Sequence, residues 1–342
     1  MRTRVCITID TEFSIGGAFS DPSRSPLAEP LVWCNVNGRS EGLGFMLETF
    51  HQHGIQATFF VETVQRYHFK HDPMRPIVHR IQDDGHEIQL HTHPCWSVFQ
   101  HDDWRERVRD QRRQDDFRDR PVEDSVRLLE QGIETFRDWG LPRPTAFRSG
   151  NLQYDANLYK ALAITKIPYS SNVAHAIFNT GDERFALYSG VHEREGVLEC
   201  PVLTFADWQV AGRKHLKSLT IAGTSFAETR RLLEAAHTAQ IPLVVILTHP
   251  FEYIQKHDIG FRHTRRHRLT QQRLRKLCAY LGEHRDRFDG CGMAQAASAI
   301  TPSERNVLLE GTLWQSLPRM AAQVAYSKYG AWELARTQGR TA

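Results

Sequence analysis

The sequence predicts an α/β protein whose strands form a (β/α) barrel, either complete or with part of the ring missing. Short apolar runs alternate with helical periodicity along most of the 342 residues, and such alternation favours parallel strands joined by right-handed crossovers. The chain length suits a barrel better than a doubly wound sheet. The first apolar run is also not followed by a glycine-rich phosphate loop, which argues against a nucleotide-binding fold.

The first half of the chain contains alternating strand and helix signals. A helix with apolar residues at the i, i+3, i+4 and i+7 positions begins at Leu43 and is ended by Gly54. A second helix passes through Ile77 and Ile81, and a third begins at Pro121, since proline suits the first helical position. Strands are predicted where β-branched and aromatic residues gather, at 3–9, 55–61, 86–91 and 144–148.

The second half continues the alternation. Further strands are predicted at 167–171, 197–205 and 242–249, and further helices at 155–164, 225–239 and around 274–281. Between residues 100 and 120, charges of both signs are dense. There we expect a solvated helix or loop without a chemical role.

We divide the chain into a barrel over 1–300 and a helical extension over 301–342. Residues 301–304, TPSE, have the spacing of a capping box with proline at the first helical position, so a helix is predicted to start there and to break at Pro318. Its apolar face is expected to pack on the barrel rather than to lie on a membrane.

Composition indicates a cytoplasmic protein. Six cysteines occur without a CxxC pair, as in reduced intracellular chains. A strand begins at residue 3, where a signal peptide would need an apolar leader, and no apolar run approaches the roughly 20 residues that span a bilayer. The net charge of +3 does not argue for nucleic acid. The basic segment 261–268 faces either an anionic group or solvent.

Polar side chains stand where predicted strands end. In a parallel barrel these carboxyl ends converge on one mouth, where active sites lie. Asp10 and Glu12, two residues apart on an extended strand, point the same way and need a cation, unless they form a turn or pair with Arg4 or Arg148. The other polar strand ends are His91-Thr92-His93-Pro94-Cys95-Trp96, Arg148-Ser149-Gly150-Asn151 and Thr248-His249-Pro250.

The pair His91 and His93, followed by Cys95, favours a metal site over hydrogen-bonded core histidines. An oxygen ligand with imidazoles suits Zn²⁺ or a similar divalent ion.

Four segments in this order resemble the polysaccharide deacetylases, the NodB-homology group of carbohydrate esterases. They span most of 1–290 and leave the tail beyond 300 uncovered. The resemblance implies a distorted, incomplete (β/α) barrel of the NodB-homology type and a metal-dependent hydrolase that removes the N-acyl group of an amino sugar. The matching segments are ITIDTE (7–12), QATFF with GHEIQLHTHPCW (56–60 and 85–96), FRSGN (147–151) and ILTHP (246–250).

By this resemblance Asp10 corresponds to the general base, and Glu12 takes the place of the metal carboxylate. His91 matches the first metal histidine. Arg148 resembles the arginine that keeps the base ionised, and His249 resembles the general acid.

The segment FADWQ looks like the family's Asp-Trp element. By that likeness Asp207 tunes the acid histidine and Trp208 lines the cleft. Trp96 is a further candidate for stacking on a sugar ring, with a place in the core as its alternative.

The sequence departs from the family at one metal ligand. The family's second metal histidine stands four residues after the first, and Cys95 occupies that position. Either Cys95 binds as a thiolate, or His93 substitutes for it, or the metal site is incomplete. A zinc ion is the first expectation, with Co, Mn and Ni as alternatives.

The cytoplasmic expectation favours a glycan precursor, a nucleotide-linked or lipid-linked N-acyl amino sugar, over a finished extracellular polysaccharide. Two alternatives keep the same fold. One is a hydrolase of a non-sugar amide or cyclic imide, and the other is a catalytically inactive carbohydrate-binding homologue, suggested by Cys95. Nucleic-acid binding ranks last, because no recognition motif accompanies the basic segment.

Overall fold

A computed structural model describes residues 2–110, 115–210, 213–311, 319 and 321. Its centre is a curled sheet in the order β12-β1-β4-β5-β6-β7-β9-β8, with β15 pairing beside β1. All neighbours are parallel except β8, which is antiparallel to β9. The strands are β1 (Thr3–Thr11), β4 (Thr58–Glu62), β5 (Glu87–Thr92), β6 (Ala146–Ser149), β7 (Tyr169–Ser170), β8 (His192–Arg194), β9 (Val197–Glu199), β12 (Leu243–Thr248) and β15 (Phe288–Gly290).

The two sides of this sheet approach each other through the segment after β9. Val202 forms a parallel bridge with Val245 of β12, and the Leu203 N–H donates to the Val245 carbonyl at 3.0 Å. Thr220 forms a second parallel bridge, with Leu247. The sheet therefore curls into the distorted, incomplete (β/α) barrel that the sequence predicted.

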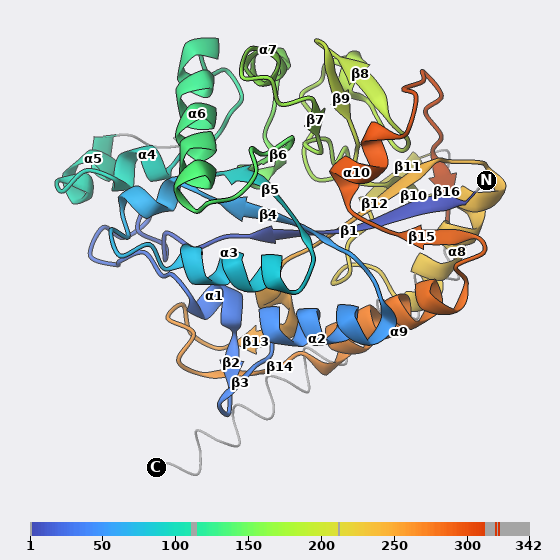
Figure 1. The fold of residues 1–342 in the computed structure, drawn as a ribbon, viewed down its shortest axis with the longest axis horizontal. Coiled ribbons are helices and arrows are strands. Elements are labelled where there is room, and N and C mark those ends of the chain that lie inside the picture. Colours follow the sequence, from blue (N-terminus) through green and yellow to red (C-terminus); the bar gives the residue numbers. More distant parts are fainter. Residues whose placement is uncertain (1, 111–114, 211–212, 312–318, 320, 322–342) are drawn as a thin grey trace.

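Helices cover the outside of the curled sheet. In Figure 1, α6 and α7 lie above the central strands, and α2 and α9 lie below them. The predicted glycine stop is confirmed, since Gly54 ends α2 with a φ of 61°. The helices are α1 (Pro30–Trp33), α2 (Leu43–His53), α3 (Met74–Asp83), α4 (Trp96–Phe99), α5 (Trp104–Asp110), α6 (Val122–Asp138), α7 (Ala156–Ile164), α8 (Phe226–Thr238), α9 (Arg268–Glu283) and α10 (Met293–Ser298).

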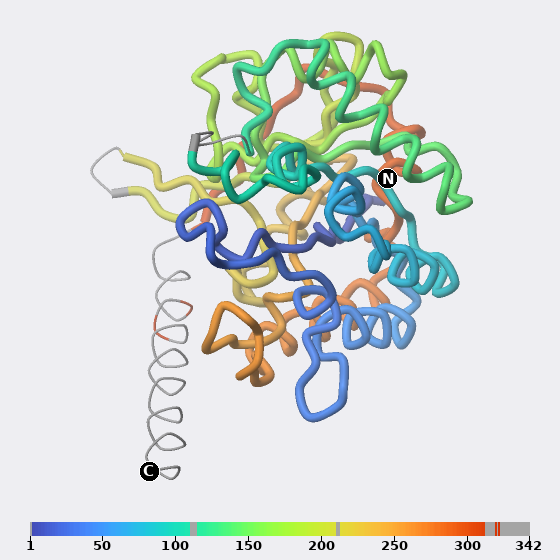
Figure 2. Tube along the Cα trace, turned by 90° about the vertical axis from the view of Figure 1, so that its left-hand side faces the viewer, coloured from blue at the N-terminus to red at the C-terminus, as the bar shows by residue number. Residues whose placement is uncertain are grey.

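Three small sheets lie outside the barrel. The hairpin of β10 (Thr204–Val210) and β11 (Arg213–Ser218) extends from the body of the molecule, yellow in Figure 2, and β10 also pairs with β16 (Leu309–Glu310). The other two are β2 (Asn35–Val36) with β3 (Arg39–Ser40), and β13 (Ile254–Lys256) with β14 (Thr264–Arg266). Within the described residues, the helices are all too short or too polar to cross a membrane.

Two sequence predictions are wrong. The strand predicted over 197–205 is divided into β9 and β10, with Pro201 between them, because proline has no N–H for a strand ladder. The helix predicted to begin at Thr301 is absent from 301–308. There the Ser303 N–H donates to the Val191 carbonyl at 3.0 Å, so tertiary hydrogen bonds override the local capping signal. The rest of the predicted helical extension lies outside the described residues.

Strand register brings the polar strand ends to one place. Glu62 at the end of β4 pairs with His91 of β5, and His91 pairs with Arg148 of β6. Asp10 of β1 pairs with Phe60 of β4, two residues before Glu62, and His249 directly follows the end of β12. In-register partners of parallel strands point to the same side of a sheet. The barrel therefore gathers these side chains at one mouth.

Candidate metal centre and catalytic site

Glu12, His91 and His93 form one compact group at this mouth. We call it the metal group, because its three side chains are of the types that bind divalent cations. The Glu12 carboxylate oxygen Oε2 lies 2.9 Å from His91 Nε2 and 2.7 Å from His93 Nε2. The three side chains offer ligand atoms that all lie within 4.8 Å of one another. The ends of β1 and β5 therefore bring one carboxylate and two imidazoles together.

The outer nitrogen of each imidazole already has an acceptor. His91 Nδ1 lies 2.8 Å from the Arg148 carbonyl, and His93 Nδ1 lies 2.8 Å from Asp115 Oδ2. If both Nδ1 atoms donate their protons there, both Nε2 lone pairs face the Glu12 oxygen. Three electron-pair donors that converge in this way fit a divalent cation, and histidine ligands are commonly oriented by such outer acceptors.

The charges of this group are strongly coupled. Burial lowers the pKa of His93, but the carboxylates of Asp115 and Glu12 outweigh it and hold that pKa well above its usual range. Burial raises the pKa of Glu12, but His93 and His91 leave it well below its usual range. The site therefore favours positive charge between these side chains, which a divalent cation would supply in place of the imidazole protons.

Glu62 supports the backbone beneath His93. Its Oε2 accepts the His93 N–H at 2.5 Å, and its Oε1 accepts the N–H groups of Thr63 at 2.8 Å and Val64 at 2.9 Å. Burial raises the pKa of Glu62 to about 7, against the opposing effects of His93 and His91. These bonds fix the turn that aims His93 at Glu12.

Cys95 lies on the other side of His93. Its possible ligand atom belongs to a second group with His93 and Asp115. Burial, with Asp115 next in importance, raises the pKa of the Cys95 thiol well above its usual range, so the thiol is neutral. The Cys95 N–H also donates to Asp115 Oδ1 at 3.2 Å. In the described structure it is therefore His93, rather than Cys95, that shares a group with Glu12 and His91.

A buried ion pair stands beside the metal group. Arg148 is fully buried, and its Nη1 donates to Asp10 Oδ1 and to Thr8 Oγ1, each at 2.8 Å. Its Nη2 and Nε donate to the Ser171 hydroxyl and carbonyl, and the guanidinium lies 4.4 Å from the Phe60 ring centroid. A guanidinium held at so many points fixes the orientation of the Asp10 carboxylate.

His249 faces the second oxygen of Asp10. The distance from His249 Nε2 to Asp10 Oδ2 is 3.8 Å, and His249 Nδ1 lies 3.1 Å from Glu252 Oε1. The Glu252 carboxylate is itself held by the Thr248 hydroxyl at 2.8 Å. Burial lowers the pKa of His249, but Glu252, Asp10 and Glu12 raise it to about 9. His249 is therefore an imidazolium at neutral pH.

Two predicted site residues lie elsewhere. Asp207 does not tune His249 as predicted, because it is 2% exposed and forms an ion pair of 2.7 Å with Arg319. Glu252 occupies the position that was expected for Asp207. Trp96 is 1% exposed inside an aromatic cluster with Phe69 and Phe99, so it is a core residue and cannot stack on a sugar.

Trp208, on the β10–β11 hairpin, stacks on His215 with a centroid distance of 5.1 Å and an interplanar angle of 7°. Its ring is partly exposed, and a contact with substrate stays a prediction.

Three supporting residues were missed in the sequence. Glu62 ends a strand, as the other polar residues do, and Glu252 follows His249 by three positions, so both carried a local signal. Asp115 carried none. It lies in the charged stretch 100–120, for which we expected no chemistry, and only the tertiary fold brings it to His93.

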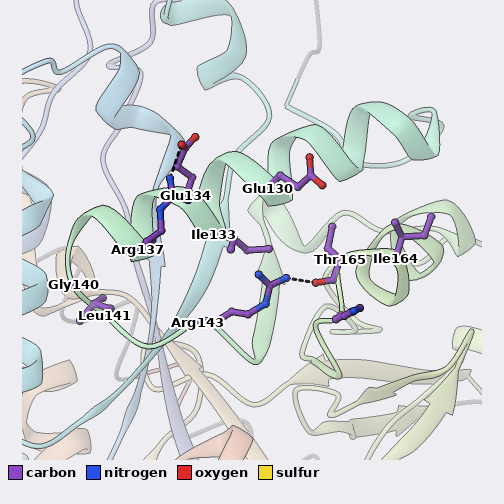
Figure 3. Close-up of a pocket in the computed structure, with 10 residues that line it drawn as sticks. Glu130, Ile133, Glu134, Arg137, Gly140, Leu141, Arg143, Ile164 and Thr165 are labelled. Atoms are coloured by element: carbon purple, nitrogen blue, oxygen red, sulfur yellow. Dashed lines mark hydrogen bonds and ion pairs between the residues drawn. The ribbon is translucent and has the colours of Figure 1, made fainter.

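A pocket of about 710 Å³ opens beside the metal group. Asp115 forms part of its wall, together with Phe19, Arg118, Gln153 and Phe178. A different pocket, of about 980 Å³, lies between the C-terminal parts of α6 and α7 and is lined by residues such as Glu134, Arg143 and Ile164 (Figure 3). That second pocket contains no residue of the metal group and lies at the opposite end of the strands.

Comparison with known proteins supports the sequence resemblance. The polysaccharide deacetylase family model matches residues 37–169, which include Glu62, His91, His93 and Arg148. A search of curated proteins found no match.

Among solved structures, a putative polysaccharide deacetylase from Mycobacterium smegmatis is 18% identical with a TM-score of 0.49, over 89% of this chain and 94% of that one. A family 4 carbohydrate esterase from Streptomyces lividans is 13% identical with a TM-score of 0.40, over 88% and 98%. A 4-alpha-glucanotransferase from Thermococcus litoralis is 10% identical with a TM-score of 0.50, over 91% and 42%. The family model confirms the resemblance seen in the sequence: over residues 37–169 this chain matches the polysaccharide deacetylase family.

Proposed function

We propose that this protein is a metal-dependent deacetylase that hydrolyses the N-acyl amide of an amino sugar or glycan precursor. The observation that carries the proposal is the placement of a metal-ligand group, Glu12 with His91 and His93, at the same mouth as the Asp10–Arg148 pair and His249. The family match supports a hydrolase of this class.

Glu12, His91 and His93 are the residues that would hold the cation. One carboxylate and two imidazoles suit Zn²⁺ and leave coordination positions open, while Co, Mn and Ni accept the same donors. When bound there, a divalent cation would supply Lewis acidity toward the acyl carbonyl and the attacking water.

The protein's own groups can carry the protons of amide hydrolysis. Asp10 accepts a proton from the attacking water at Oδ2, because Oδ1 is engaged by Arg148. His249 donates the proton on Nε2 to the amine nitrogen as the carbon–nitrogen bond breaks. An amine leaves an amide only once it is protonated, so the reaction needs the acid as well as the base.

The pocket beside Asp115 is the proposed place for the sugar. Phe19 and Phe178 offer aromatic surface there, and Arg118 and Gln153 offer polar groups. We also propose a cytoplasmic location, which would make a nucleotide-linked or lipid-linked precursor the substrate. A cyclic imide hydrolase is the alternative that keeps the same chemistry.

Metal analysis combined with an acetate-release assay tests the proposal. The purified protein is expected to carry stoichiometric divalent metal, and to release acetate from N-acetylated amino sugars. Chelation should abolish the release, and added Zn²⁺ or Co²⁺ should restore it. Cleavage of small cyclic imides alone would favour the alternative substrate. If the protein neither binds metal nor releases acetate, it is an inactive homologue and the proposal is wrong.

Glu252 is expected to set the alkaline limb of the pH profile. Its carboxylate raises the pKa of His249, so Glu252→Gln should lower that pKa. The acid must be protonated to work, so activity is retained below this pKa and lost above it. The alkaline limb of the kcat profile should therefore move to lower pH, with unchanged metal content. An alkaline limb at its wild-type position would contradict a role for Glu252 in holding the His249 proton.

A further inference from the structure

A second charged site lies between α8 and α9, the two helices that pack side by side at the right of Figure 1. A pocket of about 490 Å³ opens there, and its walls include Arg231, Arg273, Lys276 and Arg319. Glu228 is the acidic residue among the lining side chains. The pocket contains none of the residues assigned to hydrolysis.

Both carboxylates near this pocket pair with one buried arginine. Arg319, which is buried, donates to Asp207 Oδ2 at 2.7 Å and to Glu228 Oε1 at 3.0 Å. Arg273 is 6% exposed, and its Nη1 donates to the backbone carbonyls of Ile221 and Ala222. Its Nε has no hydrogen-bond partner among the described residues. A buried guanidinium N–H without an acceptor is costly.

Lys217 adds to the excess of positive charge. It donates to the Gly223 carbonyl, and burial, together with the nearby Arg319, lowers its pKa to about 8. Within the part of the chain that the structure describes, five cationic side chains thus lie around two carboxylates. The sequence around Arg319, residues 311–332, contains neither Asp nor Glu.

The pocket lies at the same end of the barrel as the metal group. The segment that leads into α8 runs parallel to β12, where Thr220 pairs with Leu247 and the Ile221 N–H donates to the Leu247 carbonyl at 3.1 Å. His249 follows two residues later. The first turns of α8 and α9 both contribute walls, and the N-terminal ends of helices favour anions.

We propose that this pocket binds the phosphate group of a soluble ligand, either a phosphate monoester or a diphosphate. A monocarboxylate would leave most of the excess positive charge uncompensated, whereas a di- or trianion matches it. Arginine also presents forked N–H donors that fit phosphate oxygens. The inference does not rest on the proposed hydrolysis, because it uses neither the metal ligands nor the acid and base.

Calorimetric titration of the metal-loaded protein with inorganic phosphate and with pyrophosphate tests the site at constant ionic strength. Wild type should bind at least one of them saturably. Arg273→Met should weaken binding about 10-fold to 100-fold, since it removes a charged hydrogen-bond donor. Arg231 is exposed at the rim of the pocket, so Arg231→Met should not affect folding. This variant is expected to weaken phosphate or pyrophosphate binding several-fold.

Arg275→Met is the matched control, because it removes an exposed cation from the same helix but outside this pocket. It should bind like wild type. The proposal is overturned if wild type shows no saturable binding. It is also overturned if binding survives both Arg273→Met and Arg231→Met, as it would if phosphate bound at the metal instead. Equal weakening by Arg275→Met would mean a general attraction to a basic surface, and also overturns it. If Arg273→Met does not fold, Arg231→Met decides. A failure here leaves acetate release intact, so it is distinguishable from failure of the proposed function.

Discussion

Replacement of His93 by alanine is expected to remove the bound metal and to reduce acetate release to the level of the chelated protein. His93 Nε2 is one of two imidazole nitrogens directed at Glu12. Loss of a direct ligand should exceed the roughly 10–100-fold loss of affinity that follows removal of an outer partner of a ligand. Elemental analysis and acetate release measured on the same preparation check both parts of this result.

Cys95→Ser is the matched control for that experiment. The thiol is neutral and lies beside Asp115, so the serine variant should keep stoichiometric metal and most of its activity. The metal content and activity of Asp115→Asn should lie between those of Cys95→Ser and His93→Ala. This substitution weakens the acceptor of His93 Nδ1 but leaves the ligand in place. If Cys95→Ser loses the metal while His93→Ala retains it, the thiol is the third ligand and our ligand assignment is wrong. Thermal melting of each variant separates lost metal from lost fold.

The sequence could predict the residues of the metal group because they follow a local rule. Each stands at the carboxyl end of a buried strand, and parallel pairing carries those ends to one mouth. The register bears this out, since His91 pairs with both Glu62 and Arg148. Asp10 and Glu12 needed only their spacing of two residues at the end of β1.

The sequence predictions are wrong where contacts between distant parts of the chain determine the position of a side chain or the local backbone structure. Asp115 reaches His93 from a loop whose charges are indistinguishable, in sequence, from a solvated surface. Asp207 looked like a partner of His249, but the ion pair with Arg319, far along the chain, holds it elsewhere. The capping signal at Thr301 was outweighed by hydrogen bonds of the following segment to residues 188–191. In each case the residue or segment forms its contacts with a partner more than 20 residues away along the chain.

The choice between His93 and Cys95 was open in the sequence because both follow His91 on the same side of the chain. The structure distinguishes them by their neighbours. The Glu62 carboxylate accepts the His93 N–H, which turns the imidazole toward Glu12. Cys95 is the N-cap residue directly before the short helix α4 and is 2% exposed. Its backbone and thiol both face Asp115. Thus the turn after β5, rather than the residue spacing, determines which of the two side chains faces Glu12.

Replacement of His249 by alanine should reduce acetate release about 10²–10⁴-fold, the usual contribution of one proton-transfer group. The metal content should be unchanged, because His249 contacts Asp10 and Glu252 rather than Glu12, His91 or His93. Turnover with N-acetylated amino sugars, measured at saturating metal, checks the first part, and elemental analysis checks the second. Turnover close to that of wild type would remove His249 from the acid role.

Hydrolysis of an ester substrate tests separately whether His249 protonates the leaving group. A nitrophenolate leaves without being protonated, so His249→Ala should slow the hydrolysis of 4-nitrophenyl acetate much less than it slows the hydrolysis of the amide. Asp10→Asn should slow both, because the base acts on the water and not on the leaving group. A parallel loss of ester and amide hydrolysis in His249→Ala would indicate that the histidine positions Asp10, 3.8 Å away, instead of donating the proton. The contrast between the two substrates therefore distinguishes His249 as the donor of the amine's proton from His249 as a residue that only positions Asp10.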